Sequence, residues 1–379
     1  MPRVLTFVEA VREATAQIMA ADKNVILIGE GVPDPKCVFG TTKDLQKEFP
    51  DRVFDMPISE NALTGACVGM AVTGLRPIIV HQRIDFMLYA MDQIVNNAAK
   101  WFSMFGGNAG TCPMVIRCIV GRGWGQGNQH SQNLAGLFAT IPGLKVFVPS
   151  NAKDAKGMLI SASKQEGPVV FVEHRWLHNT TSEVPEEMYE TFVDPELGVG
   201  DYRLRSNTYK SCAKVISNMY DRRSPRITVV AWGHMVLEAI KAGKILAESA
   251  IEIEILDMRS MRPLDIKTVK KSVLSTKRLL VLDDSWRFNG IAGEVIAQIA
   301  EDHEIDLDYS PKRVTLPDGY APSSPHSAPD YYPRTAVIVE EMLRMLFLGD
   351  KEEELINKAR AYDQERPHDV PDQNFKGPF

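Results

Sequence analysis

The amino-acid sequence predicts an α/β protein made of two three-layer α/β/α domains, and three observations carry that prediction. Short apolar runs alternate with helical patterns along most of the chain, which is typical of α/β proteins. The runs are apolar almost throughout, as expected for parallel strands that helices cover on both faces. The alternation is lost once, in a polar stretch near the middle, and such a long structureless stretch favours a domain boundary there.

The first domain is expected to span 1–180 and to begin with an amphipathic helix. Its strands are the apolar runs at 24–31, 76–82, 112–120, 144–150 and 168–175. Helical patterns occupy 85–105 and 151–165, and Ser150 can cap the second of these helices.

A polar linker is expected at 181–225, and a second domain at 226–348 repeats the alternation of strand and helix. Strands are expected at 226–233, 251–265 (a strand with a loop), 277–285 and 312–318. Helices are expected between them, at 234–250, 266–275 and 290–303. The residues at 349–379 are charged and predict a peripheral helix followed by an extended end.

Composition and charge exclude several classes of function. The chain has 379 residues, 44% hydrophobic and 24% charged, and a formal net charge of −6, which disfavours nucleic acid or an anionic membrane as its main partner. No uncharged apolar run reaches the roughly 18 residues of a membrane span, and the start has no signal-peptide pattern. The five cysteines show no CxxC spacing, so neither zinc nor a disulfide framework is indicated. We therefore expect a cytoplasmic protein.

A glycine-rich loop follows the third apolar strand. The stretch GRGWGQGNQHSQ, at 121–132, contains four glycines with Arg122 and Trp124 between them, and it delivers His130. A turn needs only one or two glycines, so four indicate a backbone that passes close to another group or a loop that changes shape. A structural turn with an incidental histidine is the alternative.

Several side chains lie where strands end, which is where ligands of parallel sheets bind. Gln82, Arg83 and Phe86 follow the strand at 76–82. Arg83 can bind an anion or form a structural ion pair, and Phe86 can simply pack in the core. Glu60 stands among small and apolar residues, where a buried carboxylate needs a compensating partner. The alternative for Glu60 is a helix N-terminal glutamate favoured by the dipole.

Asp283 and Asp284 also end a strand, where a carboxylate pair suits acid–base work, a metal or a solvated cap. His234 ends another strand and is expected near a domain interface. The sequence has no P-loop, no strand-linked GxGxxG and no nucleophile elbow. It also lacks the pattern of GDG followed by NN that marks the diphosphate–magnesium site of thiamine enzymes.

Eight motifs occur in a fixed order between about residues 5 and 346: LIGEGV, RVFDMPISENALTGACVGMAVTGLRPI, DFMLYAMDQIVNNAAK, QHSQ, PGLKVFVPSNAKDAKGML, PVVFVEHRWL, DMRSMRPLD and YYPRTAVIVEEM. Together they resemble the beta subunit of the thiamine-diphosphate-dependent component of 2-oxo acid dehydrogenase complexes, a group that includes the pyruvate, branched-chain and acetoin enzymes. The resemblance implies an N-terminal pyrimidine-binding domain with a parallel sheet and a transketolase-type C-terminal domain.

The resemblance also implies roles for the candidate residues. Glu60 matches the glutamate that shares a proton with the cofactor's aminopyrimidine ring and so favours the tautomer that deprotonates the thiazolium carbon. Phe86 matches the aromatic residue that packs on that ring, and Gln82 matches a polar neighbour. His130 matches the histidine that acts on the substrate or the lipoyl arm. Asp154 lies where some relatives bind structural potassium.

A partner is implied as well. In this family an alpha subunit supplies the diphosphate–magnesium motif, so thiamine diphosphate and magnesium are held mainly by the partner, and the assembly is an alpha2beta2 heterotetramer. The substrate is a small 2-oxo acid, and a lipoyl acyltransferase takes the acyl group.

Three residues depart from the family pattern. Relatives commonly have an apolar or aromatic residue where Arg83 stands and a smaller glycine loop where Arg122 and Trp124 stand, so these three predict a substrate with a second anionic group. Two other functions stay open. One is half of a split transketolase-like enzyme that moves a two-carbon unit. The other is a non-catalytic partner of the alpha subunit. The presence of both Glu60 and His130 argues against this second function.

Overall fold

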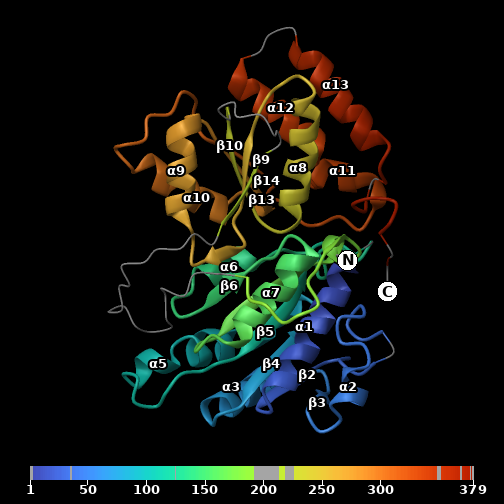
Figure 1. The fold of residues 1–379 in the computed structure, drawn as a ribbon, viewed down its shortest axis with the longest axis vertical. Helices are drawn as coiled ribbons and strands as arrows, with labels where there is room; N and C mark the ends of the chain where they lie inside the picture. Colours follow the sequence, from blue (N-terminus) through green and yellow to red (C-terminus); the bar gives the residue numbers. More distant parts are fainter. Residues whose placement is uncertain are drawn as a thin grey trace.

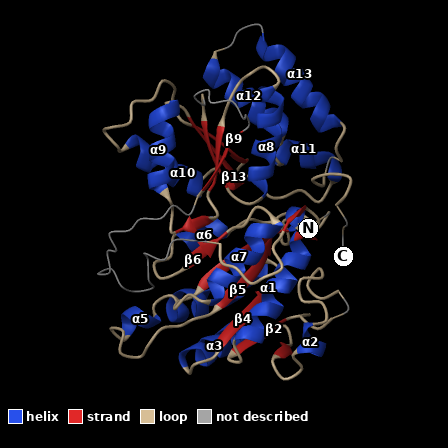
Figure 2. Cartoon of the chain, in the orientation of Figure 1, coloured by secondary structure: helices blue, strands red, loops and turns tan. Residues whose placement is uncertain are grey.

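The computed structural model describes residues 3–34, 36–123, 125–191, 213–217, 226–347, 351–367, 369–375 and 377. These residues form two α/β domains, with the N-terminal domain below the C-terminal domain in Figure 1. Each domain has a central sheet with helices packed against it (Figure 2). This architecture confirms the fold class that the sequence predicts.

A seven-stranded sheet forms the centre of the N-terminal domain, in the order β12-β6-β7-β5-β4-β2-β3. The strands from β2 to β7 pair in parallel. Nearly every residue of β2, β4, β5 and β7 is buried, which explains their continuous apolar sequences. The bounds are β2 (Val25–Gly29), β3 (Val53–Asp55), β4 (Arg76–His81), β5 (Val115–Val120), β6 (Lys145–Phe147) and β7 (Val169–His174).

Helices cover both faces of this sheet. Residues of α1 (Phe7–Ala21) and α7 (Ala152–Ser163) share one core with it, and residues of α3 (Glu60–Val72) and α6 (Ala135–Ala139) share the other. A short α2 (Leu45–Glu48) precedes β3. Asn151, rather than the expected Ser150, caps α7 by accepting a hydrogen bond from the backbone of Asp154. Ser150 instead donates to Asp257 in the other domain.

The single helix expected at 85–105 is interrupted. The segment contains α4 (Ile84–Met87), a 3₁₀ turn η1 (Leu88–Ala90), a π-helix η2 (Asp92–Ala98) and α5 (Trp101–Met104). Within η2, Asn97 donates to the Asp92 carbonyl and to the Gln93 side chain, while Asn96 donates to the Asp92 carboxylate. Such local side-chain bonds compete with a regular helix.

The C-terminal domain has a five-stranded sheet in the order β14-β13-β10-β11-β9. Only β9 runs antiparallel to its neighbour. The strands are β9 (Lys214–Ser217), β10 (Thr228–Ala231), β11 (Glu254–Asp257), β13 (Leu279–Trp286) and β14 (Lys312–Leu316). Residues of α8 (His234–Ala247), α12 (Thr335–Leu346) and α13 (Lys351–Gln364) form the core on one face. Those of α9 (Ile266–Thr276) and α10 (Ile291–Ala300) pack on the other, and η4 (Pro325–Ser327) and α11 (Ala328–Tyr331) follow β14.

The two domains are joined by more than a linker. The strand β12 (Ser260–Arg262) leaves the C-terminal domain and pairs antiparallel with β6, so it completes the N-terminal sheet. One continuous core runs from the N-terminal sheet to Val230, Trp232 and Leu256 of the C-terminal domain. None of the described helices is long and apolar enough to cross a membrane.

Both ends of the expected linker at 181–225 include a strand. The strand β8 (Thr181–Glu183) pairs with β1 (Val4–Thr6), and β9 is an edge strand of the C-terminal sheet. The remaining stretches at 192–212 and 218–225 lie outside the described residues.

The C-terminal segment returns to the junction of the domains. The expected peripheral helix is α13, which buries Leu355 and Ala359. Beyond it, Arg366 forms two hydrogen bonds with the buried Glu238 carboxylate. Farther on, the ring of Phe375 lies 4.7 Å from the guanidinium carbon of Arg175 in the N-terminal domain. The segment therefore contacts both domains.

Candidate active site

An open cavity of about 680 Å³ lies where β2, β3 and β4 end and α3 begins. Parallel strands end at the same edge of a sheet, so the side chains that follow them come together there. The cavity contains three residues that the sequence predicts for the site, Glu60, Gln82 and Phe86. Three further carboxyl groups, those of Glu30, Asp34 and Asp55, also line it.

Glu60 is the first residue of α3, where a negative charge interacts favourably with the helix dipole. The preceding Ser59 makes no side-chain capping bond. The carboxyl group is partly exposed and lines the cavity. Glu60 is therefore both the helix N-terminal glutamate that the sequence suggests and a candidate acid–base group.

Glu30 and Asp55 were not predicted as site residues. Glu30 accepts a 3.2 Å hydrogen bond from the backbone of Ser59, directly beside Glu60. Burial raises the pKa of Glu30, and the negative charge of Glu60 adds to that effect. Asp55 accepts a 2.9 Å bond from the backbone of Gly31. Both residues close an apolar strand, which is the same signal that identified Gln82.

The backbone of Gly31 lies against Gln82. Gln82 Nε2 donates to the Glu30 carbonyl at 2.9 Å, which fixes the amide at the edge of the cavity. Gly31 has a φ of +67°, and a Cβ there would lie 2.6 Å from Gln82 Nε2. A side chain at this position would be strained by the positive φ and would displace the Gln82 amide, so glycine is favoured.

His130 lies next to the cavity. Its ring packs edge-on against Phe86, with 5.0 Å between ring centroids and an interplanar angle of 88°. The glycine loop passes close to two groups on the way. A Cβ at Gly121 would lie 2.4 Å from His174 Nε2, and one at Gly127 would lie 2.4 Å from Ser323 Oγ. Close approach of the backbone therefore accounts for these glycines.

Arg83 and Arg122 hold this loop in place. Arg83 is 2% exposed, and it donates to the Gly121 carbonyl at 2.8 Å and to the Gln126 side chain. Arg122 is fully buried and donates to the carbonyls of Pro322 and Ser323 in the C-terminal domain. Substrate binding by the two arginines stays a prediction that this geometry does not support, because the terminal nitrogens of both guanidinium groups donate to the protein itself.

The other predicted site residues lie away from the cavity or cannot be placed. Trp124 lies outside the described residues. Asp154 receives hydrogen bonds from Arg259 at 2.9 and 3.2 Å and from Asn151 at 2.8 Å. A cation would have to compete with that guanidinium, so we do not propose potassium at Asp154. Among the described residues, no group of three or more His, Cys, Asp or Glu side chains is placed to hold a metal ion.

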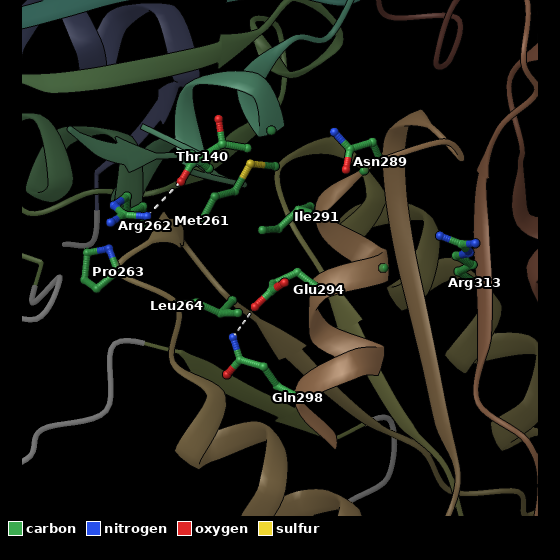
Figure 3. Close-up of a pocket in the computed structure, with 14 residues that line it drawn as sticks. Thr140, Met261, Arg262, Pro263, Leu264, Asn289, Ile291, Glu294, Gln298 and Arg313 are labelled. Atoms are coloured by element: carbon green, nitrogen blue, oxygen red, sulfur yellow. Dashed lines mark hydrogen bonds between the residues drawn. The ribbon is translucent and has the colours of Figure 1, made fainter. Parts of the chain in front are cut away.

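A second cavity, of about 700 Å³, lies between the domains and is lined by residues of α6, β12 and α10. Figure 3 shows Glu294 and Gln298 hydrogen-bonded to each other on its wall. Arg262, on the opposite side, donates to the Ala139 carbonyl. None of the residues predicted for chemistry lines this cavity, so the edge of the N-terminal sheet is the better candidate site.

Known domain families match both halves of the chain. Residues 3–180 match the family "Transketolase, pyrimidine binding domain", and residues 218–338 match "Transketolase, C-terminal domain". These matches agree with the two domains of the structure.

Full-length relatives match as well. The chain is 39% identical to the beta subunit of acetoin:2,6-dichlorophenolindophenol oxidoreductase from Cupriavidus necator, a match that covers 89% of this chain and 96% of the relative. It is 35% identical to the beta subunit of the pyruvate dehydrogenase E1 component from Bacillus subtilis, covering 84% and 92%.

Among solved structures, a split-gene transketolase described as an inactive beta4 tetramer superposes with a TM-score of 0.66. The match covers 91% of this chain and 99% of that one, at 20% identity. At this identity the likeness shows the fold alone, and the fold is the one that the domain matches indicate.

Proposed function

The chain belongs to the family of transketolase-like dehydrogenase beta subunits, and from this membership we propose that it is the beta subunit of a thiamine-diphosphate-dependent 2-oxo acid dehydrogenase. The complete enzyme decarboxylates a small 2-oxo acid and passes the acyl group to a lipoyl carrier. One observation carries the proposal. Glu60, Gln82 and Phe86 line one cavity, and His130 packs edge-on against the Phe86 ring.

The cavity suits a planar nitrogen heterocycle. It offers a carboxyl group at a helix N-terminus, an amide that is fixed in place and an aromatic ring. The chemistry that thiamine diphosphate supplies when bound is a carbon nucleophile and an electron sink for decarboxylation. Glu60 would hold a ring nitrogen and move a proton at that atom. Phe86 would pack against the ring, and Gln82 would bound its edge.

Glu30, which lies beside Glu60, and His130, which packs on Phe86, support this role. Glu30 lies close enough for the Glu60 charge to raise its pKa, so the pair disfavours full ionisation of both carboxyl groups. His130 is half-buried and packs against Phe86, so it would act on a substrate bound beside the cofactor.

The rim of the cavity supports a partner of alpha type. Four large apolar side chains around the site are exposed: Phe54 (42%), Ile58 (85%), Leu88 (38%) and Tyr89 (72%). Exposed apolar groups that cluster in this way mark interaction surfaces. We propose that an alpha subunit covers them, holds the diphosphate and magnesium, and completes an alpha2beta2 enzyme in the cytoplasm.

The relatives favour this function over the alternatives. Those at 35–39% identity are dehydrogenase or oxidoreductase beta subunits, whereas the split transketolase shares the fold at 20% identity. A non-catalytic subunit would not need a carboxyl group that shares a cavity with an aromatic ring and an imidazole that packs on that ring.

Co-expression with an alpha-type chain tests the proposal. The purified complex, supplied with thiamine diphosphate and magnesium, is assayed for carbon dioxide release from a panel of 2-oxo acids and for two-carbon transfer from ketose phosphates. We expect decarboxylation of at least one 2-oxo acid and its loss in Glu60→Gln. Transfer from ketose phosphates without any decarboxylation would contradict the proposal.

A further inference from the structure

A chain of hydrogen bonds crosses the domain junction and ends at the segment that carries His130. The backbone of Trp176 donates to His174 Nδ1 at 3.1 Å, and His174 Nε2 lies 3.0 Å from Asp284 Oδ2. The other oxygen of Asp284 accepts a 2.7 Å bond from Asn133 Nδ2. Asn133 Oδ1 in turn accepts from the backbone of Ala135 at 3.1 Å. Every group in this chain has its donor or acceptor role fixed by its neighbour.

The protonation of the chain follows from these bonds. Because Nδ1 of His174 accepts, the proton of a neutral His174 is on Nε2 and points at Asp284. Burial opposes the ionisation of Asp284, but the hydrogen bonds from His174 and Asn133 and the nearby His234 outweigh it and lower the Asp284 pKa. His234 stacks on His174 with 5.1 Å between ring centroids. Asp284 is therefore a carboxylate at neutral pH and accepts from both sides.

The segment after His130 is held from both domains. Gln132 Nε2 donates to Asp85 Oδ1 at 2.7 Å, next to Phe86 in the N-terminal domain. Asn133 donates to Asp284 at the end of β13 in the C-terminal domain. These two bonds lie two and three residues after His130, so they fix the direction in which the backbone leaves it.

We propose that Asp284, oriented by His174, is a positioning residue that sets His130 against Phe86. The inference rests on the proposed function, in which His130 acts at the substrate. Asp284 does not line the cavity, so it acts through the loop. A second carboxylate at the junction, Asp257, accepts from Ser150 and not from the segment that follows His130. Asp257 is therefore the matched control for a role in joining the domains.

The test uses the alpha–beta holoenzyme and two readouts. The first is kcat and KM for the best 2-oxo acid, which report the step that needs His130. The second is hydrogen–deuterium exchange at the thiazolium carbon, which depends on Glu60 and not on His130. We expect Asp284→Asn to lower kcat roughly 10- to 100-fold, as a misplaced catalytic group does, and to leave KM and the exchange rate within about twofold.

A double-mutant cycle with His130→Gln isolates the positioning role. If Asp284 acts only through His130, Asp284→Asn in the His130→Gln background lowers kcat by less than about twofold. Asn133→Ala, which breaks the same bond from the loop, gives the same pattern and serves if Asp284→Asn does not fold. Asp257→Asn leaves kcat within about twofold.

Two sets of results overturn the inference in distinguishable ways. Equal losses from Asp284→Asn with and without His130, or a parallel loss of thiazolium exchange, refute the positioning role and leave the proposed function intact. If the wild-type complex decarboxylates no 2-oxo acid, or if His130→Gln is fully active, the assigned role of His130 fails and the positioning role falls with it.

Discussion

Replacement of Arg83 by methionine separates a structural role of this arginine from a substrate-binding role. The side chain is 2% exposed and donates to Gly121 and Gln126, at two points along the glycine loop. Its guanidinium lies 5.6 Å from the ring of Phe39. The variant Arg83→Met keeps much of the side-chain volume and removes both hydrogen bonds and the charge.

The magnitude follows from two opposing effects. Hydrogen bonds to a charged group contribute about 1.5–3 kcal/mol each, so two contribute about 3–6 kcal/mol. Burial lowers the Arg83 pKa to about 10, which corresponds to a cost of roughly 3 kcal/mol that methionine does not incur. The net loss of unfolding free energy is therefore only about 0–3 kcal/mol. The variant should fold, but its glycine loop loses the two hydrogen bonds from Arg83.

Because the loop carries His130, we expect kcat to fall about tenfold or more on every substrate. The assay compares pyruvate with a dianionic 2-oxo acid, in the complex with the alpha subunit. The ratio of kcat/KM between the two acids should stay within about twofold of wild type. Arg76→Met is the matched control, because Arg76 also donates to carbonyls, those of Ser163 and Gln165, but outside the site. A loss confined to the dianionic acid would refute this reasoning and identify Arg83 as a substrate residue.

Three further predictions follow. The isolated chain should bind thiamine diphosphate poorly, since the diphosphate anchor is expected on the partner; calorimetry that finds tight, magnesium-dependent binding without a partner would contradict a shared site. Glu60→Gln should abolish hydrogen–deuterium exchange at the thiazolium carbon in the complex and leave thermal unfolding unchanged, and unaltered exchange removes Glu60 from the mechanism. Burial and the charge of Asp154 raise the Asp257 pKa to about 6. The folded state therefore holds this proton more tightly than the unfolded state, so the Asp257 contribution to stability rises as pH falls from about 6 to 4. Relative to Asp257→Asn, wild type should gain up to about 3 kcal/mol between pH 7 and pH 4, and parallel urea-unfolding profiles of the two proteins would show that Asp257 does not titrate in this range.

The sequence predicts the centre of the candidate site because that centre depends on local signals. Gln82 and Phe86 follow an apolar strand, and Glu60 begins a helix, so the rule for parallel sheets brings them to one edge. The same rule points to Glu30, which ends the strand at β2. His130 was predicted from its glycine loop; its ring packs against Phe86, and its catalytic role stays a prediction.

The structural roles of Arg83 and Arg122 could not be predicted from the sequence, for a physical reason. Arg122 donates to carbonyls of residues 200 and 201 positions away in the sequence. No local sequence pattern identifies a backbone carbonyl as the acceptor of such a bond. The strand β12 is a similar case, because its three residues look like part of a loop and pair with a sheet of the other domain. The π-helix at η2 depends on asparagine side chains that bond to nearby groups, which apolar periodicity does not report.

The bond between Arg122 and Asp369 joins residues 247 positions apart in the sequence. This sequence separation determines when the bond can form during synthesis of the chain. At a synthesis rate of about 5–20 residues per second, Asp369 leaves the ribosome roughly 10–50 s after Arg122. All the strands from β2 to β7 precede Asp369 by far, so this parallel part of the N-terminal sheet can form early, before β12 joins its edge. Its glycine loop must wait for Pro322, Ser323 and finally Asp369. A nascent chain can therefore have a folded parallel sheet before its glycine loop is held in place, and a partner subunit that needs that loop can recognise only chains whose synthesis has passed this point.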